Sequence, residues 1–206
     1  MSENSKVSLR LAQLDDAQAI IDIYKPYVID TAITFTSKVP TVADVQKTMA
    51  DIKKHYPYLV CEIDNQVVGF AYANKVRPQE AYRWNAELSI YINPAFHGRG
   101  IATALYTALF SILKVQGYCN LYAVITMPND ASVALHRHFG FNDLGIHGAN
   151  GYKLGAWRDV LWMEYRIPGA IDPGAFGNPL PLDKVKQNDI DTALALAAAL
   201  LSGAQR

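Results

Sequence analysis

A glycine-bearing turn between a strand-like segment and a long amphipathic helix is the feature that most constrains this fold. Residues 86–92 alternate like a β-strand, glycines follow within residues 96–100, and residues 101–116 carry apolar side chains at helical spacing. Such a turn directs free backbone N–H groups and the positive end of the helix dipole at one point, which favours anion binding. Gly98 and Gly100 allow a diphosphate to approach closely and Arg99 adds charge. The alternative is a plain turn whose glycines only supply positive φ.

Two other phosphate-binding motifs do not fit this turn. The P-loop pattern G-x-x-x-x-G-K-[ST] is absent from the sequence. Gly98-x-Gly100 begins a dinucleotide fingerprint, but Thr103 stands where the third glycine is required, and no suitably placed acidic residue follows on the next strand. Neither a P-loop NTPase nor an NAD-dependent enzyme is therefore expected.

The rest of the chain predicts alternating strands and helices. Strands are expected at residues 7–12, 58–63, 66–74, 86–92, 121–126 and 158–166. Helices are expected after a cap at Asp15, from Thr41 or Asp44 to residue 55, at 101–116 and at 130–139. Asp64-Asn65 is a typical hairpin turn pair. The order β-α-α-β-β-β-α-β-α-β predicts a mixed α/β (α+β) protein with helices on both faces of one mixed sheet.

The character of the sequence changes after residue 167. Prolines and glycines recur through residues 168–181, which predicts a linker. An Ala/Leu-rich helix follows at residues 190–201 and ends at Gly203. We therefore divide the chain into a domain at 1–167 and a linker with a C-terminal helix at 168–206. A helix of about 12 residues is marginal alone in water, so it should pack on the core or on a second subunit.

Composition excludes several functional classes. Lys plus Arg equals Asp plus Glu at 19 each, which argues against a dedicated nucleic-acid or membrane-surface binder. The longest apolar run, residues 193–201, is too short to span a membrane, and residues 1–10 lack a signal-peptide pattern. Cys61 and Cys119 lie outside any C-x-x-C motif, which predicts buried reduced thiols in a cytoplasmic protein. His136 and His138 splay apart on a helix, so no metal site is expected.

Two motifs resemble the cofactor motifs of the GNAT superfamily of N-acetyltransferases. Residues 97–102 match the pattern Q/R-x-x-G-x-G/A, with His97 at the position that usually holds Gln or Arg. Asn129, Ser132, His136 and the Phe-Gly-Phe at 139–141 resemble N-x-x-[AS]-x-x-L-[YH]-x-x-x-G-F. Further segments at 56–60, 81–84, 87–92, 127–130 and 151–160 resemble phosphinothricin (methionine sulfoximine/sulfone) acetyltransferases. The resemblance covers residues 7–167.

This resemblance implies a GNAT fold, with a central twisted mixed sheet and helices on both faces. It implies acetyl-CoA as cosubstrate and a homodimer. Glu87 would be the general base, and His136 would either protonate the leaving thiolate or stabilise the intermediate. Backbone N–H groups near residues 90–92 would hold the carbonyl oxygen. The cofactor-binding residues would be Ile90, Tyr91, Ile92, Gly98, Arg99, Gly100, Ile101, Ala102, Thr103, Asn129 and Ser132.

The expected substrate is a small amine that carries a carboxylate. Arg77, Tyr82 and Arg83 precede the catalytic strand and would clamp that group, since Arg binds carboxylates in a bidentate manner. Tyr27, Thr31 and Phe35 would line the acceptor pocket. The resemblance implies transfer of an acetyl group to the α-amine of a phosphinothricin-type or methionine sulfoximine/sulfone-type compound. The alternatives are acetylation of a protein N-terminus or a polyamine, or an acyl-CoA-binding module without turnover; no nucleic-acid or membrane partner is expected.

Overall fold

One seven-stranded sheet forms the centre of the molecule. The structure is a computed structural model and describes residues 6–169 and 177–203. The strand order is β1-β2-β3-β4-β5-β7-β6, and β4 and β5 are parallel whereas the other neighbouring strands are antiparallel. The strands are β1 (Val7–Leu11), β2 (Tyr58–Ile63), β3 (Gln66–Lys75), β4 (Asn85–Ile92), β5 (Asn120–Thr126), β6 (Asn142–Lys153) and β7 (Ala156–Arg166).

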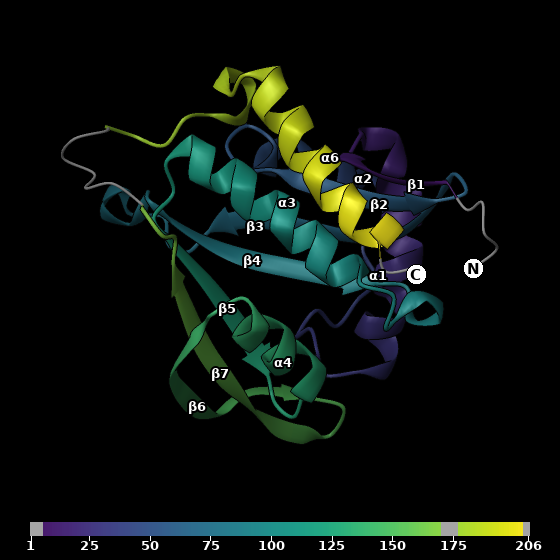
Figure 1. Cartoon of the computed structure of the whole chain (residues 1–206). Helices are drawn as coiled ribbons and strands as arrows, with labels where there is room; N and C mark the ends of the chain where they lie inside the picture. Colours follow the sequence, from purple (N-terminus) through teal and green to yellow (C-terminus); the bar gives the residue numbers. More distant parts are fainter. Residues whose placement is uncertain (1–5, 170–176, 204–206) are drawn as a thin grey trace.

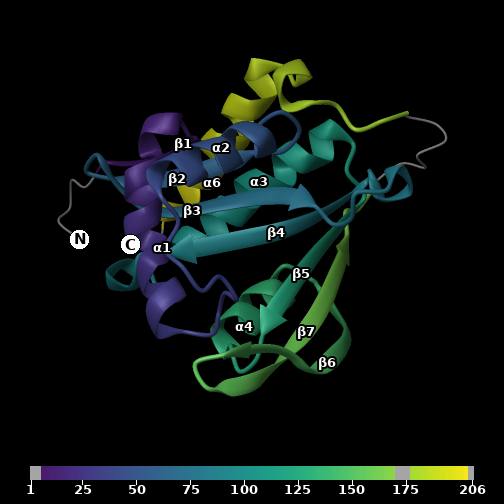
Figure 2. The same cartoon turned by 180° about the vertical axis from the view of Figure 1, so that it is seen from behind.

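Helices cover both faces of this sheet, which confirms the predicted fold class. The helices are α1 (Ala17–Asp30), α2 (Val42–Ile52), α3 (Ile101–Gln116), α4 (Asp130–His138) and α6 (Gln187–Gly203). Helices α3 and α6 lie on one face, and α1 and α2 lie on the opposite face (Figures 1 and 2). The core fills the space between these layers, with Leu59, Met49 and Leu109 completely buried. None of the described helices is both long and apolar enough to cross a membrane.

Local signals placed two of the predicted boundaries correctly and one incorrectly. Asp64 and Asn65 have φ values of 51° and 64°, as the tight hairpin turn between β2 and β3 requires. Thr41 caps α2 in a capping box with Asp44, whose carboxylate accepts from Thr41 N–H. The predicted cap at Asp15 is wrong: a short 3-10 helix occupies Leu14–Asp16, and α1 begins only at Ala17.

Strand β6 was absent from the predicted order. Gly145, Gly148 and Gly151 interrupt it, and this composition is typical of loops. It is a strand because β7 supplies its hydrogen-bonding partners over most of its length, with two register shifts. As the edge of the sheet, β6 is exposed at nearly every position.

The C-terminal helix packs against the core. Helix α6 contains the predicted helical segment and buries Ile190, Ala193, Ala197 and Leu201. Its neighbours are α3 and β1, and Figure 1 shows it lying alongside α3. The prediction that this helix packs on the core is confirmed. Residues 170–176 of the expected linker lie outside the described residues. So do residues 1–5 of the segment for which no signal-peptide pattern was found.

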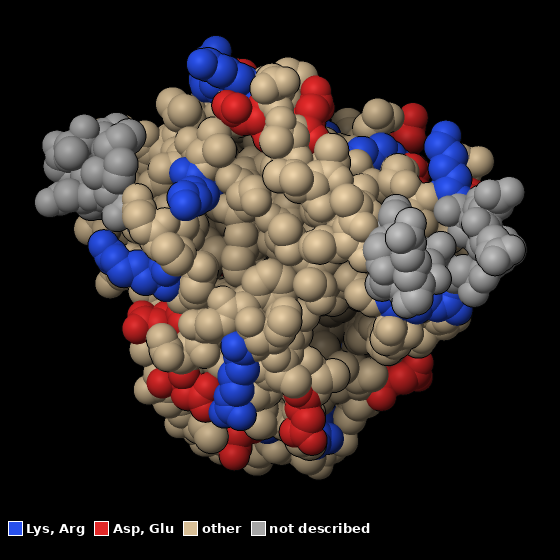
Figure 3. Space-filling model, in the orientation of Figure 1, with Lys and Arg blue, Asp and Glu red and all other residues tan. Residues whose placement is uncertain are grey.

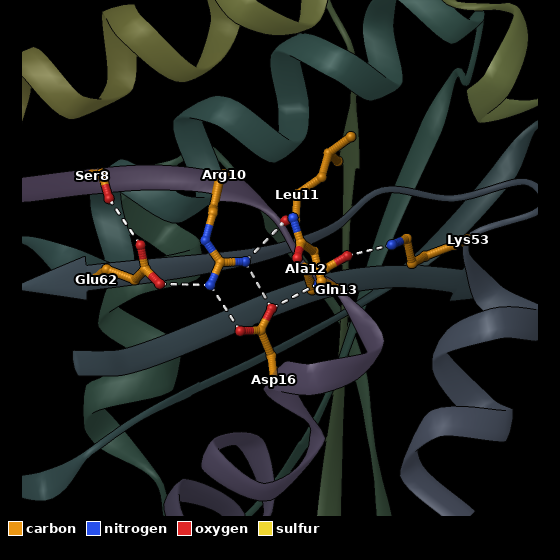
Figure 4. Close-up of polar contacts among 8 residues, drawn as sticks. All are labelled: Ser8, Arg10, Leu11, Ala12, Gln13, Asp16, Lys53 and Glu62. Atoms are coloured by element: carbon orange, nitrogen blue, oxygen red, sulfur yellow. Dashed lines mark hydrogen bonds and ion pairs between the residues drawn. The ribbon is translucent and has the colours of Figure 1, made fainter. Parts of the chain in front are cut away.

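A charged network fixes β1 to the elements around it (Figure 4). The Arg10 guanidinium forms two hydrogen bonds of 2.7 Å with the Asp16 carboxylate and one of 2.5 Å with Glu62. Lys53 donates to the carbonyl oxygen of Ala12. Burial alone would raise the pKa of Asp16, but hydrogen bonds from Arg10 and from the Gln13 N–H outweigh it and lower that pKa. The hydrogen bond from Arg10 also lowers the pKa of Glu62.

Candidate active site

The sheet divides where β4 and β5 diverge, and this fork sets the geometry of the site. The register of β4 with β5 covers Asn85–Glu87, and Glu87 pairs with Tyr122. The register of β4 with β3 continues to Ile92. Among the described strands, β4 therefore has a neighbour on only one side beyond Glu87, which leaves an open edge.

Backbone N–H groups on that open edge are free to bind a ligand. Asn93 N–H donates to Val68 O on the β3 side, and Ile92 O accepts from the Tyr27 hydroxyl at 2.5 Å. Backbone groups of successive residues in a strand point to alternate edges. The N–H groups of Ile90 and Ile92 consequently point into the gap between β4 and β5, where they can donate to a carbonyl oxygen.

The glycine turn has the conformation that an anion site needs. Gly98 and Gly100 have φ values of +73° and +76°, in the left-handed region, and Gly100 is the N-cap of α3. A Cβ at Gly98 would meet no atom within 4 Å, so the backbone there faces open space. The Tyr27 hydroxyl donates to Ile92 O and accepts from His97 Nε2–H at 2.9 Å, which ties the turn to the end of β4.

A cavity of about 460 Å³ joins the open edge of β4 to this turn. Figure 3 shows a hollow on this face of the molecule, near the N-terminal end of α3 and beside α4. The cavity includes every predicted cofactor-binding residue: Ile90, Tyr91, Ile92, Gly98, Arg99, Gly100, Ile101, Ala102, Thr103, Asn129 and Ser132. Asn129 also caps α4 by accepting from Ser132 N–H. The arrangement fits a long anionic ligand with a diphosphate at the turn and an extended arm along β4.

A second cavity of about 250 Å³ lies at the fork and contains both predicted catalytic residues, Glu87 and His136. It shares Ile33, Ile90, Tyr91, Asn129 and Ser132 with the first cavity, so the two spaces are contiguous. Burial raises the pKa of Glu87 above its ordinary value. A carboxylate with a raised pKa is a stronger base, and this one lines the smaller cavity, next to the larger cavity that contains the glycine turn.

His136 is buried, and both of its ring nitrogens are engaged. Nδ1 lies 2.8 Å from the Ser132 carbonyl oxygen, which can only accept, so Nδ1 carries the proton. Nε2 lies 3.0 Å from the Tyr106 hydroxyl and accepts a hydrogen bond from it. Burial lowers the pKa of His136, which keeps the ring neutral at pH 7. This arrangement holds the Tyr106 hydroxyl at the wall of the cavity.

The other predicted acceptor residues line three different cavities. Phe35 lines the cavity with Glu87. Thr31 lines a neighbouring cavity, and its hydroxyl donates to Tyr27 O. Tyr27 lines the larger cavity, with the glycine turn, and not the cavity that contains Glu87, because its hydroxyl donates to Ile92 O at the end of β4.

Arg77, Tyr82 and Arg83 lie outside both cavities in this chain. They precede β4, at its paired end, whereas the cavities open at the other end of the strand. The Arg83 guanidinium donates to Glu80 and to Asn178 and lies over the Trp84 ring. The expected clamp is therefore not formed at the fork, because nearness in sequence to Glu87 does not determine which end of the strand a residue occupies.

Several residues of the site carried no sequence signal. Tyr106 belongs to the apolar helix α3, and its sequence pattern predicts only a core position for it. Thr34 follows α1, Thr126 ends β5 and Asn150 lies within β6, so these residues meet only in the folded chain.

Comparison with known proteins agrees with this geometry. Residues 9–162 match the family described as Acetyltransferase (GNAT) domain. The phosphinothricin N-acetyltransferase of Streptomyces viridochromogenes is 32% identical over 83% of this chain and 94% of its own length. The L-methionine sulfoximine/L-methionine sulfone acetyltransferase of Pseudomonas paraeruginosa is 31% identical over 78% of this chain and 94% of its own.

A solved structure shows the same fold with a ligand bound. The phosphinothricin acetyltransferase of Sinorhizobium meliloti, in complex with acetyl-CoA, superposes with a TM-score of 0.76 at 32% identity. The match covers 88% of this chain and 96% of that one. The protein is an acetyltransferase that belongs to the GNAT family.

Proposed function

We propose that the protein transfers the acetyl group of acetyl-CoA to the α-amine of a small amino-acid analogue of the phosphinothricin or methionine sulfoximine/sulfone type. The observation that carries this proposal is the contiguity of two cavities. One contains the glycine turn and the free edge of β4, and the other contains Glu87. The Streptomyces and Pseudomonas relatives support the choice of acceptor class.

In this reaction Glu87 accepts a proton from the acceptor ammonium group, directly or through a water molecule. The neutral amine attacks the thioester carbonyl carbon, and the N–H groups of Ile90 and Ile92 stabilise the negative charge that develops on its oxygen. As the C–S bond breaks, the attacking nitrogen gives up its remaining extra proton to form the neutral amide, this proton passes to the departing CoA thiolate, and the N-acetyl product and CoA leave. The raised pKa of Glu87 suits it to accept a proton near neutral pH.

For His136 we propose a stabilising role rather than that of a charged acid. Its Nδ1–H is committed to Ser132, and the ring is kept neutral by burial. Its Nε2 accepts a hydrogen bond from the Tyr106 hydroxyl, so His136 orients a second residue that lines the cavity. The cofactor assignments, the homodimer and the cytoplasmic location belong to the same proposal.

Release of free CoA from acetyl-CoA in the presence of an amine panel tests the function. The panel contains phosphinothricin, methionine sulfoximine, methionine sulfone, a polyamine and a peptide with a free N-terminus. We expect turnover with the first three compounds. Turnover restricted to the polyamine or the peptide would refute the acceptor class, and binding of acetyl-CoA without turnover on any amine would indicate a binding module.

A further inference from the structure

Arg158 on β7 is a partly buried cation without a protein partner at its Nε. That nitrogen is buried and has no hydrogen-bond partner among the described residues. None of the ion pairs within the described part of the chain includes Arg158. An unpaired buried donor on a charged group is costly and uncommon, and neither an ion pair nor a hydrogen bond at Nε within the described residues accounts for this guanidinium.

Arg158 lines a cavity of about 280 Å³ that adjoins the site at the fork. Thr126 and Ile33 line both this side cavity and the cavity that contains Glu87. Thr126 pairs with Val160, and Arg158 lies two residues before Val160 on the same strand, about 7 Å away along its axis. Arg158 therefore lies beside the cavity that contains Glu87 but away from Glu87 itself, which pairs with Tyr122, four residues before Thr126 on β5.

The strand register places a second cation on the same face. Arg158 pairs with Gly151, and Lys153 pairs with Ala156, so these residues share the face that meets the segment after α1. Lys153 is 9% exposed, and its Nζ donates to Thr34 O at 2.7 Å. A side chain at Gly151 would collide with the Phe35 ring, so the β6–β7 hairpin is closely packed on this segment.

We propose that Arg158 forms a subsite for an acidic group that the acceptor carries several bonds away from its α-amine, such as a carboxylate or a phosphinate. This inference rests on the proposed function, because it names the part of the acceptor that a second site would bind. A guanidinium offers two parallel N–H donors to such a group. Lys153 lies on the same face, where its Nζ donates to Thr34 O.

Asp30 also lines the side cavity and would oppose an anion there. It does not form an ion pair with Arg158 among the described contacts, so the two groups are not already neutralised by direct contact. This gives a variant with the opposite expected sign. Asp30→Asn should leave unchanged or lower the KM for an anionic acceptor. If Asp30 instead served to hold Arg158 in place, Asp30→Asn would raise that KM, as Arg158→Gln does.

The test compares Arg158→Gln with the wild type on two acceptors of similar length, phosphinothricin and the neutral-chain methionine sulfone. We expect the KM for phosphinothricin to rise about tenfold or more, as for loss of a charge-assisted hydrogen bond. The KM values for methionine sulfone and acetyl-CoA should stay within about twofold. Arg166→Gln, on the same strand but bonded to Asn120 at the other end of β7, is the matched control. If Arg158→Gln does not fold, Arg158→Lys is used instead. It keeps the positive charge but loses the paired N–H donors of the guanidinium, so the KM for phosphinothricin should rise less.

Binding and turnover separate the two proposals. Calorimetric titration of the protein with phosphinothricin in the presence of CoA measures the subsite without any reaction. Binding that depends on Arg158 but leads to no acetylation would refute the proposed function and support the subsite. Acetylation of phosphinothricin with the same KM in wild type and Arg158→Gln would overturn the subsite alone. Neither binding nor acetylation of phosphinothricin would overturn both.

Discussion

Replacing Glu87 by Gln tests the mechanism most directly. The substitution keeps the size of the side chain and removes its ability to accept a proton. General-base catalysis contributes about 10²–10⁴-fold, equivalent to about 3–5 kcal/mol on the barrier. Because Glu87 sits in the fork and the turn lies at the far end of the cofactor cavity, acetyl-CoA affinity should be unchanged. We therefore expect kcat to fall by this factor while the Kd for acetyl-CoA stays within about twofold.

The pH dependence of kcat gives a second, independent readout of the same variant. Activity requires the carboxylate form of Glu87, so the rate falls as pH decreases through its pKa. Burial raises that pKa, which moves the acidic limb upward from the ordinary range of glutamate. The limb should be present in the wild type and absent in Glu87→Gln.

The assay is continuous detection of the free CoA thiol at saturating concentrations of both substrates. Glu164→Gln on β7 removes a carboxylate from another strand of the same sheet and should leave kcat and its acidic limb intact. Near-native kcat in Glu87→Gln, with an unchanged limb, would show that the base lies elsewhere. The cofactor assignment could survive that result, but the mechanism could not.

Three further perturbations address the cofactor turn, the charged network and the C-terminal helix. Gly100→Asp should keep the fold, because Asp tolerates positive φ and the nearest atom to its Cβ is 3.6 Å away, but it should weaken acetyl-CoA binding in calorimetry. Arg10→Met should cost about 2 kcal/mol at pH 7 in urea unfolding and less at pH 3. Asp16 and Glu62 have lowered folded-state pKa values, so their contribution exists above the unfolded values and disappears as pH falls through the folded ones; equal losses at both pH values would contradict this. Truncation after residue 167 exposes the apolar surface beneath α6 and should lower Tm by about 10 °C; an unchanged Tm would show that α6 adds no stability.

Local chemistry made much of the fold predictable. The Asp64-Asn65 turn, the Thr41 cap and the apolar stripe of α3 each depend on interactions within a few residues of sequence. Strand β6 depends instead on its partner: its glycine-rich sequence favours loops, and only pairing with β7 makes it a strand. A pattern read along one segment cannot contain that information.

The residues of the candidate site also divide into those that local sequence brings together and those that only the fold brings together. The residues predicted to bind the cofactor line one cavity because most of them come from one strand and the turn that directly follows it. The residues around the proposed acceptor come from distant segments, and Arg77 and Arg83, which precede Glu87 in sequence, lie at the paired end of β4. Arg158 lies about seventy residues further along the chain and reaches the site only because β7 pairs with β5.

The fork between β4 and β5 links the two halves of the proposed reaction. Pairing with β5 ends at Glu87, so the same break in the sheet opens the edge where Ile90 and Ile92 can bind a carbonyl and places the proposed base at its inner end. The proposed base and the N–H donors are therefore on one strand, which pairs with β3 from Ala86 to Ile92. A shift of β4 that moved one of them would move the others, and their spacing is preserved by the backbone rather than by side-chain packing. This predicts that substitutions around the acceptor, including those at Arg158, change which amine is used more readily than they change how the acetyl group is held.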